Sequence, residues 1–202
     1  MKLSEKVTVE QWYPNLIGYC DYLDHNKVEK IITKECLSLS KKIKKGGKNW
    51  ISNKTYNTFN TYSILKNEKF KKLNDWVLNK VLEYSNILKY QNKLNCVDAW
   101  FNIYKKYDYQ EFHDHGSSTL SAVYFLKSDA EKSSKIYFKF NLNDNLMEPT
   151  TDPSFNLTSP TVWYAPIPGR LLIFKSTLKH SVERHENNDI RISLAYNFNK
   201  VL

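Results

Sequence analysis

Two stretches in the N-terminal half of the chain carry hydrophobic residues at helical spacing. Between about residues 27 and 45, and again between about 68 and 88, apolar side chains recur every three or four positions. That period places them on one face of an α-helix. Asn26 and Asn67 precede the two stretches as candidate N-caps, and Gly46 follows the first as a stop signal. The pattern predicts two amphipathic helices that buttress one face of a sheet.

From residue 95 onward the pattern changes to short apolar runs separated by turn-forming residues, which is typical of β-strands. A loosely alternating run at residues 7–16 adds an edge strand near the N-terminus. Many short strands joined by turns predict a sandwich or a barrel. The predicted strands of the C-terminal half cover residues 99–104, 120–126, 135–140, 162–164, 170–174, 179–183 and 191–198.

Two long polar stretches interrupt these elements. Residues 48–66 are rich in Thr, Asn and Tyr, and we expect a loop with short extended pieces. Residues 141–160 are rich in Asn, Pro, Thr and Ser and predict a second loop, where a lid over a substrate could lie. The pattern contains no repeat and no linker. We therefore expect one domain, 1–202, in which residues 1–94 pack on a strand-rich core at 95–202.

The composition fits a globular protein of that size. Of the 202 residues, 41% are hydrophobic and 25% are charged. No apolar stretch reaches the roughly 18 residues that span a bilayer, and the N-terminus lacks the apolar core of a secretory signal. We expect a cytoplasmic protein without membrane contact. Cys20, Cys36 and Cys96 are widely spaced and odd in number, which favours buried free thiols over a zinc site.

The net charge of +9 has two interpretations. Lys and Arg neutralise phosphate, so the charge could reflect a nucleic-acid partner. The lysines also occur along the whole chain beside many Asn and Ile residues, a mixture that a genome of low GC content produces. The dense basic run Lys41–Lys45 fits the solvated end of a helix. The sequence leaves both interpretations open.

The stretch with the most specific chemistry is Phe112–Gly116, which holds two histidines and an aspartate. On extended backbone, residues two apart point the same way, so His113 and His115 can converge while Asp114 points elsewhere. Imidazole nitrogen is a good ligand for Fe, Zn, Cu and Ni. His180 begins a later strand and could complete the set. Because His-x-His alone is as often structural as metal-binding, the downstream residues carry much of the argument.

Arg191 follows His180 by eleven residues. A short turn between the two predicted strands, paired with each other, would place Arg191 in the same cavity as His180. A buried guanidinium is costly unless it meets a carboxylate, which it binds through two parallel hydrogen bonds. The partner could belong to a bound 2-oxoacid or to an acidic side chain of the protein. His185 lies in the polar turn between the strands, and we expect it on the surface.

The segment Ala99–Leu126, AWFNIYKKYDYQEFHDHGSSTLSAVYFL, resembles the core of the 2-oxoglutarate and Fe(II)-dependent oxygenase superfamily. Residues 166–198, with PGRLLIF, LKHSV and RISLAYNF, are similar to the second half of that core. The similarity is greatest to a family of oxygenases common in bacteria and their phages. It implies a mainly β fold with flanking helices (α+β): a double-stranded β-helix of the jelly-roll or cupin type with N-terminal buttressing helices.

The resemblance also implies roles for single residues. His113 and His180 would bind Fe(II), with His115 as the third ligand. Arg191 would bind the distal carboxylate of 2-oxoglutarate, with Ser193 beside it. The implied enzyme is a dioxygenase, expected to be a hydroxylase, that uses Fe(II), 2-oxoglutarate and O2 and converts 2-oxoglutarate to succinate.

Two further residues have the spacing of a pair that contacts 2-oxoglutarate in the nucleic-acid-repair demethylases of the superfamily. Asn102 and Tyr104 precede His113 by eleven and nine residues. They share one face of a strand, so both can reach the cavity. Tyr124, on the next strand, is a further candidate for contact with the same carboxylate.

The chain departs from the superfamily pattern at two positions. The usual motif is His-x-Asp or His-x-Glu, whereas His115 occupies the carboxylate position here. A site of three imidazoles carries one negative charge fewer, which would change its redox behaviour and its preference among metals. Asp114 would ligate instead if the backbone turned at Gly116. Tyr107 stands where a glycine often precedes the motif, which leaves the geometry of that turn open.

Two other functions fit the same residues. A three-histidine cupin-like protein would bind a metal without using 2-oxoglutarate, and a nucleic-acid demethylase would make use of the basic charge. The substrate class stays open among a free amino acid, a peptide and a nucleobase. The sequence leaves a homodimer open as well.

Overall fold

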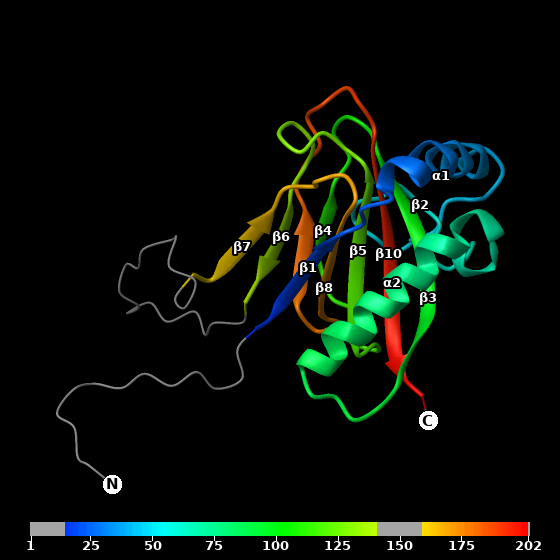
Figure 1. The fold of residues 1–202 in the computed structure, drawn as a ribbon. Helices are drawn as coiled ribbons and strands as arrows, with labels where there is room; N and C mark the ends of the chain where they lie inside the picture. The colour runs from blue at the N-terminus through cyan, green and yellow to red at the C-terminus, as the bar shows by residue number, and fades with distance from the viewer. Residues whose placement is uncertain (1–14, 141–158, 202) are drawn as a thin grey trace, which may run out of the picture.

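The computed structural model describes residues 15–140 and 159–201, which form two facing sheets with helices on one side (Figure 1). The larger sheet has the strand order β1-β8-β5-β10-β3-β2, and all its neighbouring strands are antiparallel. Its strands are β1 (Ile17–Asp21), β2 (Tyr56–Asn57), β3 (Leu94–Tyr104), β5 (Leu120–Lys127), β8 (Arg170–Lys175) and β10 (Arg191–Lys200).

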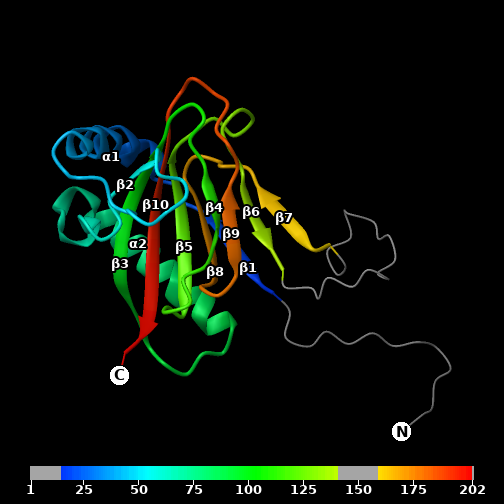
Figure 2. The ribbon, with the colours of Figure 1, turned by 180° about the vertical axis from the view of Figure 1, so that it is seen from behind.

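The smaller sheet has the order β4-β9-β6-β7 and is also antiparallel. Figure 2 shows these four strands in that order from behind. The mainly β fold of double-stranded β-helix type with flanking helices is confirmed. The strands of the smaller sheet are β4 (Gln110–His113), β6 (Ile136–Lys139), β7 (Thr161–Tyr164) and β9 (Lys179–Val182).

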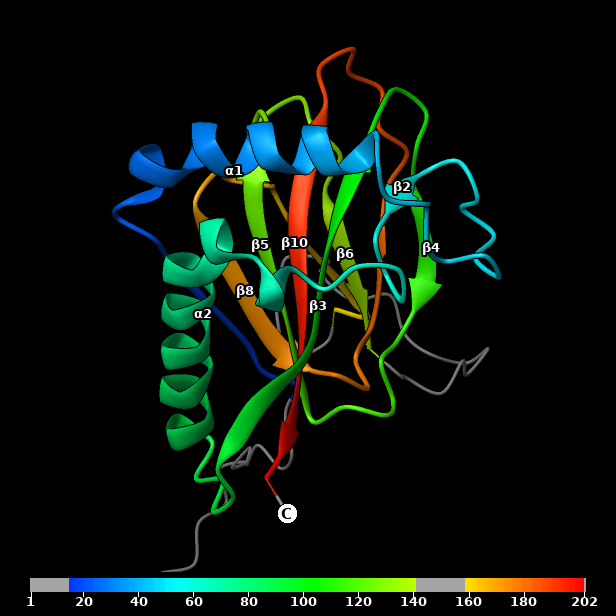
Figure 3. The ribbon, with the colours of Figure 1, turned by 90° about the vertical axis from the view of Figure 1, so that its right-hand side faces the viewer.

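Helices α1 (His25–Ser40) and α2 (Glu68–Ile87) cover the outer face of the larger sheet (Figure 3). A short 3-10 helix, η1 (Ile64–Lys66), leads into α2. Asn67 caps α2 as predicted, because its side chain accepts a hydrogen bond of 3.0 Å from the backbone N–H of Lys69. Within the described ranges, no helix is long and apolar enough to cross a membrane.

The predicted limits of α1 are wrong at both ends. The helix begins at His25 after Asp24, so Asn26 lies inside it, and it ends at Ser40 rather than near residue 45. The segment that follows, Lys41–Lys45, holds four lysines around one isoleucine. Like charges at helical spacing repel one another and offer no face to bury, which explains the early end.

Alternation along the strands separates the two faces of the larger sheet, because residues two apart share a face. Along β10, the residues packed in the core under the helices are Ile192, Leu194, Tyr196 and Phe198. The residues of β10 that alternate with them and line the cavity between the sheets are Arg191, Ser193, Ala195 and Asn197. The fold therefore has an apolar outer core and a separate inner cavity.

The strand pairing differs from the prediction at one important place. β9 and β10 do not pair with each other, because β9 belongs to the smaller sheet and β10 to the larger one. The turn between them crosses from one sheet to the other. His180 and Arg191 still meet in one cavity, because the two sheets face each other.

Several predicted boundaries also change. The stretch at 48–66 contains β2 and η1, and a separate strand, β4, ends at the histidine motif. Residues 7–14 of the predicted edge strand lie outside the described residues, and the edge strands of the larger sheet within them are β1 and β2. The predicted lid at 141–160 also lies outside the described residues, apart from its last two.

Candidate metal and cosubstrate site

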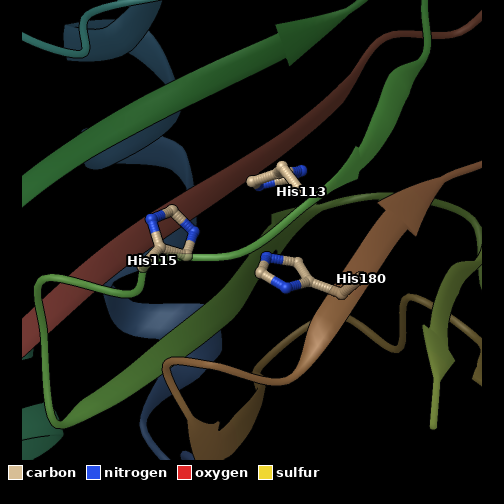
Figure 4. A group of neighbouring side chains, drawn as sticks. All are labelled: His113, His115 and His180. Carbon is tan, nitrogen blue, oxygen red and sulfur yellow. The ribbon is translucent and has the colours of Figure 1, made fainter. Parts of the chain in front are cut away.

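Three histidine side chains converge between the two sheets (Figure 4). His113 ends β4 and His180 lies opposite it in the paired strand β9, while His115 lies in the loop after β4. One nitrogen atom from each ring lies within 4.8 Å of the others. The distances between ring centroids are 4.3, 5.1 and 5.2 Å. Three imidazoles at this separation form a group that could hold one metal ion.

Backbone hydrogen bonds fix the orientation of two of the rings. Nδ1 of His113 lies 2.8 Å from the carbonyl oxygen of Glu111, and Nδ1 of His180 lies 2.9 Å from that of Leu178. A carbonyl oxygen only accepts, so Nδ1 carries the proton and donates it in both contacts. Nε2 is then left with a free lone pair, which is the tautomer that a metal ion bound at Nε2 requires.

Burial keeps the three rings neutral. It lowers the pKa of His113, and together with the two neighbouring histidines it lowers the pKa of His180 well below its ordinary value. Burial, assisted by His113, lowers the pKa of His115 to about 4. Metals bind the neutral form of imidazole, so all three rings are in the form that binds metals at neutral pH.

Asp114 does not join the histidine group. Its side chain is exposed, and its Oδ1 accepts a hydrogen bond of 3.1 Å from the backbone N–H of Gly116. This local turn holds the carboxylate away from the rings. The structure therefore brings His115, rather than Asp114, next to His113 and His180.

His185 is buried, so its predicted surface position is wrong. Its Nδ1 accepts a hydrogen bond of 3.2 Å from the backbone N–H of Ser134, and its Nε2 lies 2.7 Å from the carbonyl oxygen of Asp189. Both ring nitrogens thus have backbone partners, which compensates for their removal from water. Tyr107, whose backbone N–H donates to the carbonyl of His185, adopts a φ of +72°, a conformation that favours glycine. The glycine-like turn is therefore kept with a tyrosine.

The Arg191 side chain is fully buried and has no ion pair within the part of the chain that the structure describes. Its Nε and Nη2 lack hydrogen-bond partners, and Nη1 makes a single long contact of 3.5 Å with Oγ of Ser193. Burial lowers the pKa of Arg191, although a guanidinium stays charged. A buried and unpaired cation in a cavity is the arrangement expected where an anionic ligand supplies the missing partner.

Three other predicted residues surround this guanidinium. In the β3–β10 register, Tyr104 lies opposite Arg191 and Asn102 lies opposite Ser193. Cζ of Arg191 is 4.6 Å from the centroid of the Tyr104 ring. All four side chains are buried and line the same cavity as the histidines. Together they form a polar pocket that suits a carboxylate.

Tyr124 does not reach this pocket. Its hydroxyl lies 2.8 Å from Nδ1 of His25 in α1, in the core between the larger sheet and the helices. The cavity side of the same strand is formed by Ser121 and Val123. The prediction that Tyr124 could contact the cosubstrate is wrong, because its side chain alternates to the other face.

Residues 98–197 match the model of a protein family described as "Putative 2OG-Fe(II) oxygenase", in which 2OG stands for 2-oxoglutarate. The match covers the three histidines and Arg191. The chain belongs to this oxygenase family. It is a 2OG-dependent non-haem iron oxygenase, and Fe(II), 2OG and O2 are the cofactor and cosubstrates that the family uses. No curated protein matches the chain.

Solved structures share the fold of this oxygenase at low sequence identity. A prolyl-4-hydroxylase from Pseudomonas putida has a TM-score of 0.66 and 12% identity, with 92% of this chain and 94% of that chain covered. A viral collagen prolyl hydroxylase from Paramecium bursaria Chlorella virus-1, solved with 2OG, has a TM-score of 0.60, 13% identity and coverages of 92% and 96%.

HygX from Streptomyces hygroscopicus, solved with nickel, 2OG and hygromycin B, is also similar to the oxygenase. Its TM-score is 0.59 and its identity 15%, with 93% of this chain and 84% of that chain covered. At such identities, these structures show the fold that the oxygenase shares with them and leave its substrate to other evidence.

The sequence analysis missed a polar network in the oxygenase cavity. Asn197 lies six residues after Arg191 on the same face of β10. Oγ of Ser121 donates to Oδ1 of Asn197 and lies 2.8 Å from Oγ of Ser176. The backbone N–H of His115 donates to the carbonyl of Ser176 at 2.7 Å. This network ties the loop that carries His115 to β10, and strand alternation from Arg191 is the signal that could have found Asn197.

Two tryptophans also line the oxygenase cavity, and Trp100 shares the face of β3 on which Asn102 and Tyr104 were predicted. The centroid of the Trp50 ring lies 6.3 Å from that of the His113 ring, and the centroid of the Trp100 ring lies 5.6 Å from that of the His115 ring. Trp50 also stacks on Phe59 at 5.6 Å. Trp50 comes from a loop that precedes the oxygenase core, so no local sequence signal places it beside the histidines.

Proposed function

We propose that the chain is a hydroxylase that couples the decarboxylation of 2OG to the oxidation of a substrate not yet identified. In this proposal His113, His115 and His180 bind Fe(II), and Arg191 binds the distal carboxylate of 2OG. Membership of the oxygenase family supports the reaction class. The convergence of three neutral imidazoles supports the metal site.

The observation that carries the proposal is the unpaired guanidinium of Arg191 in the same cavity as the histidine group. Leaving a cation unpaired inside a protein costs several kcal/mol, roughly 3–5 in cases where one partner of a buried pair is removed. A bound dicarboxylate offsets that cost. A metal-binding protein that did not use 2OG would have no reason to keep Arg191 in this state.

In this proposal, separate groups of residues would hold the cosubstrate and the metal. Arg191 and the groups around it (Asn102, Tyr104 and Ser193) would fix one end of 2OG, while the histidines hold the metal at the other. Bound Fe(II) and 2OG supply the oxidising chemistry, in which O2 and 2OG give succinate, CO2 and an oxidised substrate. Trp50 would help to keep water away from the reacting groups.

The three imidazoles determine how much charge the protein would place on the metal. Imidazole is neutral, so the protein would place no negative charge on the metal, whereas a carboxylate ligand would contribute one. A dianionic cosubstrate would then meet less repulsion from the protein ligands. The same lack of a carboxylate widens the range of metals that the site accepts, since imidazole also suits Zn and Ni.

The test is cosubstrate binding and turnover in the purified chain. Anaerobic Fe(II) with 2OG is expected to give a weak visible charge-transfer band, and admission of air is expected to give succinate. Arg191→Ala is expected to weaken 2OG binding about 100-fold, because a charge-assisted pair is worth roughly 2–5 kcal/mol. Metal binding, measured by calorimetry with Mn(II), is expected to persist.

Arg170→Ala is the matched control. Arg170 forms an ion pair with Asp21 at 2.8 Å on the edge of the larger sheet, and it does not line the cavity. Its removal is expected to leave 2OG affinity within about threefold, as for other partly exposed pairs. If Arg191→Ala binds 2OG as tightly as Arg170→Ala does, the chain is a three-histidine metal protein that does not use 2OG. Absence of both the band and succinate would refute the proposal outright.

A further inference from the structure

The basic charge of the chain is concentrated in one segment. Residues 36–67 contain seven lysines and no Asp or Glu, whereas the other 170 residues hold 23 Lys and Arg against 21 Asp and Glu. The segment therefore carries +7 of the net charge of +9. Codon usage would spread such an excess over the whole chain. A local concentration of one sign instead indicates an anionic partner.

This lysine-rich segment folds beside the candidate active site. It runs from the end of α1 past β2 to η1 (Figure 3). Trp50, near its middle, lines the histidine cavity and also a neighbouring groove of about 480 Å³. We call this the lysine groove, because Lys44, Lys45 and Lys48 line it together with Trp50 and Phe59. The cavity and the lysine groove thus share one wall.

The lysine groove is built on a backbone with little freedom. A Cβ atom at Gly46 would lie 1.9 Å from the carbonyl oxygen of Phe59, and one at Gly47 would lie 2.7 Å from the Trp50 ring. Gly47 has a φ of +61°, which favours glycine. Glu111 in β4 accepts hydrogen bonds of 2.8 and 3.1 Å from the backbone N–H groups of the two residues after Trp50. The segment is therefore held in place before any partner binds.

A second groove, of about 290 Å³, begins at the next residue of the chain, Ile51. We call it the tyrosine groove, because Tyr107 and Tyr109 line it together with Lys54 and Arg184. The two tyrosines are 54% and 36% exposed, and Nζ of Lys106 and Cζ of Arg184 lie 5.4 and 5.3 Å from the centroid of the Tyr107 ring. Within the described residues, no Asp or Glu lines either groove.

The lysines of these grooves have no carboxylate partner within the described residues. Several lysines on the helices pair with nearby carboxylates, as Lys80 does with Glu83 at 2.7 Å. Across 15–140 and 159–201, Lys44, Lys48 and Lys54 form no ion pair with a carboxylate. Their charge is available to an external anion.

We propose that the two grooves bind a single-stranded nucleic acid beside the histidine cavity. Lysines spaced along a groove match a chain of phosphates, and exposed aromatic rings between them match unstacked bases. An acidic peptide would pair with the lysines but would offer no ring to stack on the exposed side chain of Tyr109. Binding needs neither metal nor 2OG, so this proposal does not depend on the proposed function. If both hold, the strand would deliver a nucleotide to the oxygenase cavity.

Fluorescence anisotropy of the full chain with a fluorescein-labelled 15-mer of oligothymidylate tests this proposal. With three or four lysine–phosphate contacts, affinity is expected to fall roughly 20- to 50-fold between 50 and 200 mM NaCl. Lys44→Glu with Lys48→Glu is expected to weaken binding at least tenfold. Tyr109→Ala is expected to weaken it at least fivefold, the effect of losing about 1 kcal/mol of base stacking.

The matched control is Lys30→Glu with Lys34→Glu on α1, which changes the net charge by the same amount outside both grooves. It is expected to weaken binding less than threefold, while thermal unfolding confirms that all variants fold. Equal losses in the two double variants would mean that only net charge matters, and the proposal would be wrong. It would also be wrong if labelled poly-L-glutamate bound as tightly as the oligonucleotide, or if the oligonucleotide did not bind at 50 mM NaCl.

Discussion

The two faces of the larger sheet are made from alternating residues of the same strands, yet their polar groups are treated in opposite ways. On the outer face of β10, Leu194 and Phe198 are buried under the helices. On the inner face of β10, Arg191 is equally buried but has no charged partner in the described residues. On β10, the Tyr196 hydroxyl of the outer face donates a hydrogen bond of 3.1 Å to Oδ1 of Asn74, whereas the inner face leaves a cation unsatisfied.

The outer face stabilises the fold, whereas the inner face is arranged to bind a ligand. Burying apolar area on the outer face stabilises the folded state by roughly 25 cal/mol per Å². An unpaired cation and neutral buried imidazoles on the inner side oppose folding. Natural proteins retain such unfavourable groups where a bound ligand compensates for them. The unpaired cation and the neutral imidazoles therefore mark the inner cavity as a binding site.

Truncating the outer face is expected to give the largest effect. Leu194→Ala removes a fully buried side chain from the core between β10 and the helices. The free energy of unfolding is expected to fall by about 3 kcal/mol, from lost burial and the cavity left behind. Urea denaturation of the ligand-free protein measures it. Leu65→Ala, at a side chain that is 37% exposed, is the control and is expected to cost less than about 1 kcal/mol. Similar values for the two variants would contradict the assignment of the core.

Replacing the buried cation of the inner face is expected to raise the free energy of unfolding rather than lower it. Arg191→Met keeps much of the side-chain volume and removes the unpaired charge. The free energy of unfolding of the ligand-free protein is expected to rise by about 2 kcal/mol, as when other buried charges are replaced by apolar residues. Binding of 2OG is expected to be lost in the same variant. A fall in stability would mean that Arg191 has a partner in the folded protein, and the comparison between the faces would not hold.

The sequence predicts those features that depend on the local periodicity of hydrophobic and polar residues. The helical spacing found α1 and α2, and the alternation in β3 and β10 put Asn102, Tyr104 and Arg191 on surfaces that the structure brings together. Tyr124 shows the limit of that reasoning, because its role was inferred from the strand and not from the face on which it lies. Its neighbour Val123 lines the cavity, while its own ring packs under the helices.

Other features depend on contacts between distant segments and leave no local signal. His185 looks like a surface residue in a polar turn, but Ser134, fifty-one positions away, donates a backbone hydrogen bond to its ring. Trp50 reaches the histidines because Glu111 of β4 holds the following backbone. The charge of residues 36–67 was visible in the sequence, yet its meaning depended on the groove that the segment forms.

The smallest expected effect that distinguishes the two faces is the pH dependence of the free energy of unfolding. The pKa of His115 is lowered by burial to about 4, from an ordinary value of 6.5. As pH falls through 6.5 the unfolded chain binds the proton first, so stability present above pH 6.5 is lost toward pH 4. In metal-free protein, His115 is expected to account for a loss of about 1.3 kcal/mol between pH 7.5 and 5.5. Urea denaturation with EDTA at both pH values measures the loss.

Two variants show whether that pH dependence belongs to the cavity. His115→Gln is expected to reduce the loss between pH 7.5 and 5.5 by about 1.3 kcal/mol, because glutamine does not titrate. Leu194→Ala is expected to lower stability equally at the two pH values, since the outer core that it disturbs is apolar. An unchanged loss in His115→Gln would show that this ring is not held neutral by burial, and its lone pair would then not be ready for a metal at neutral pH.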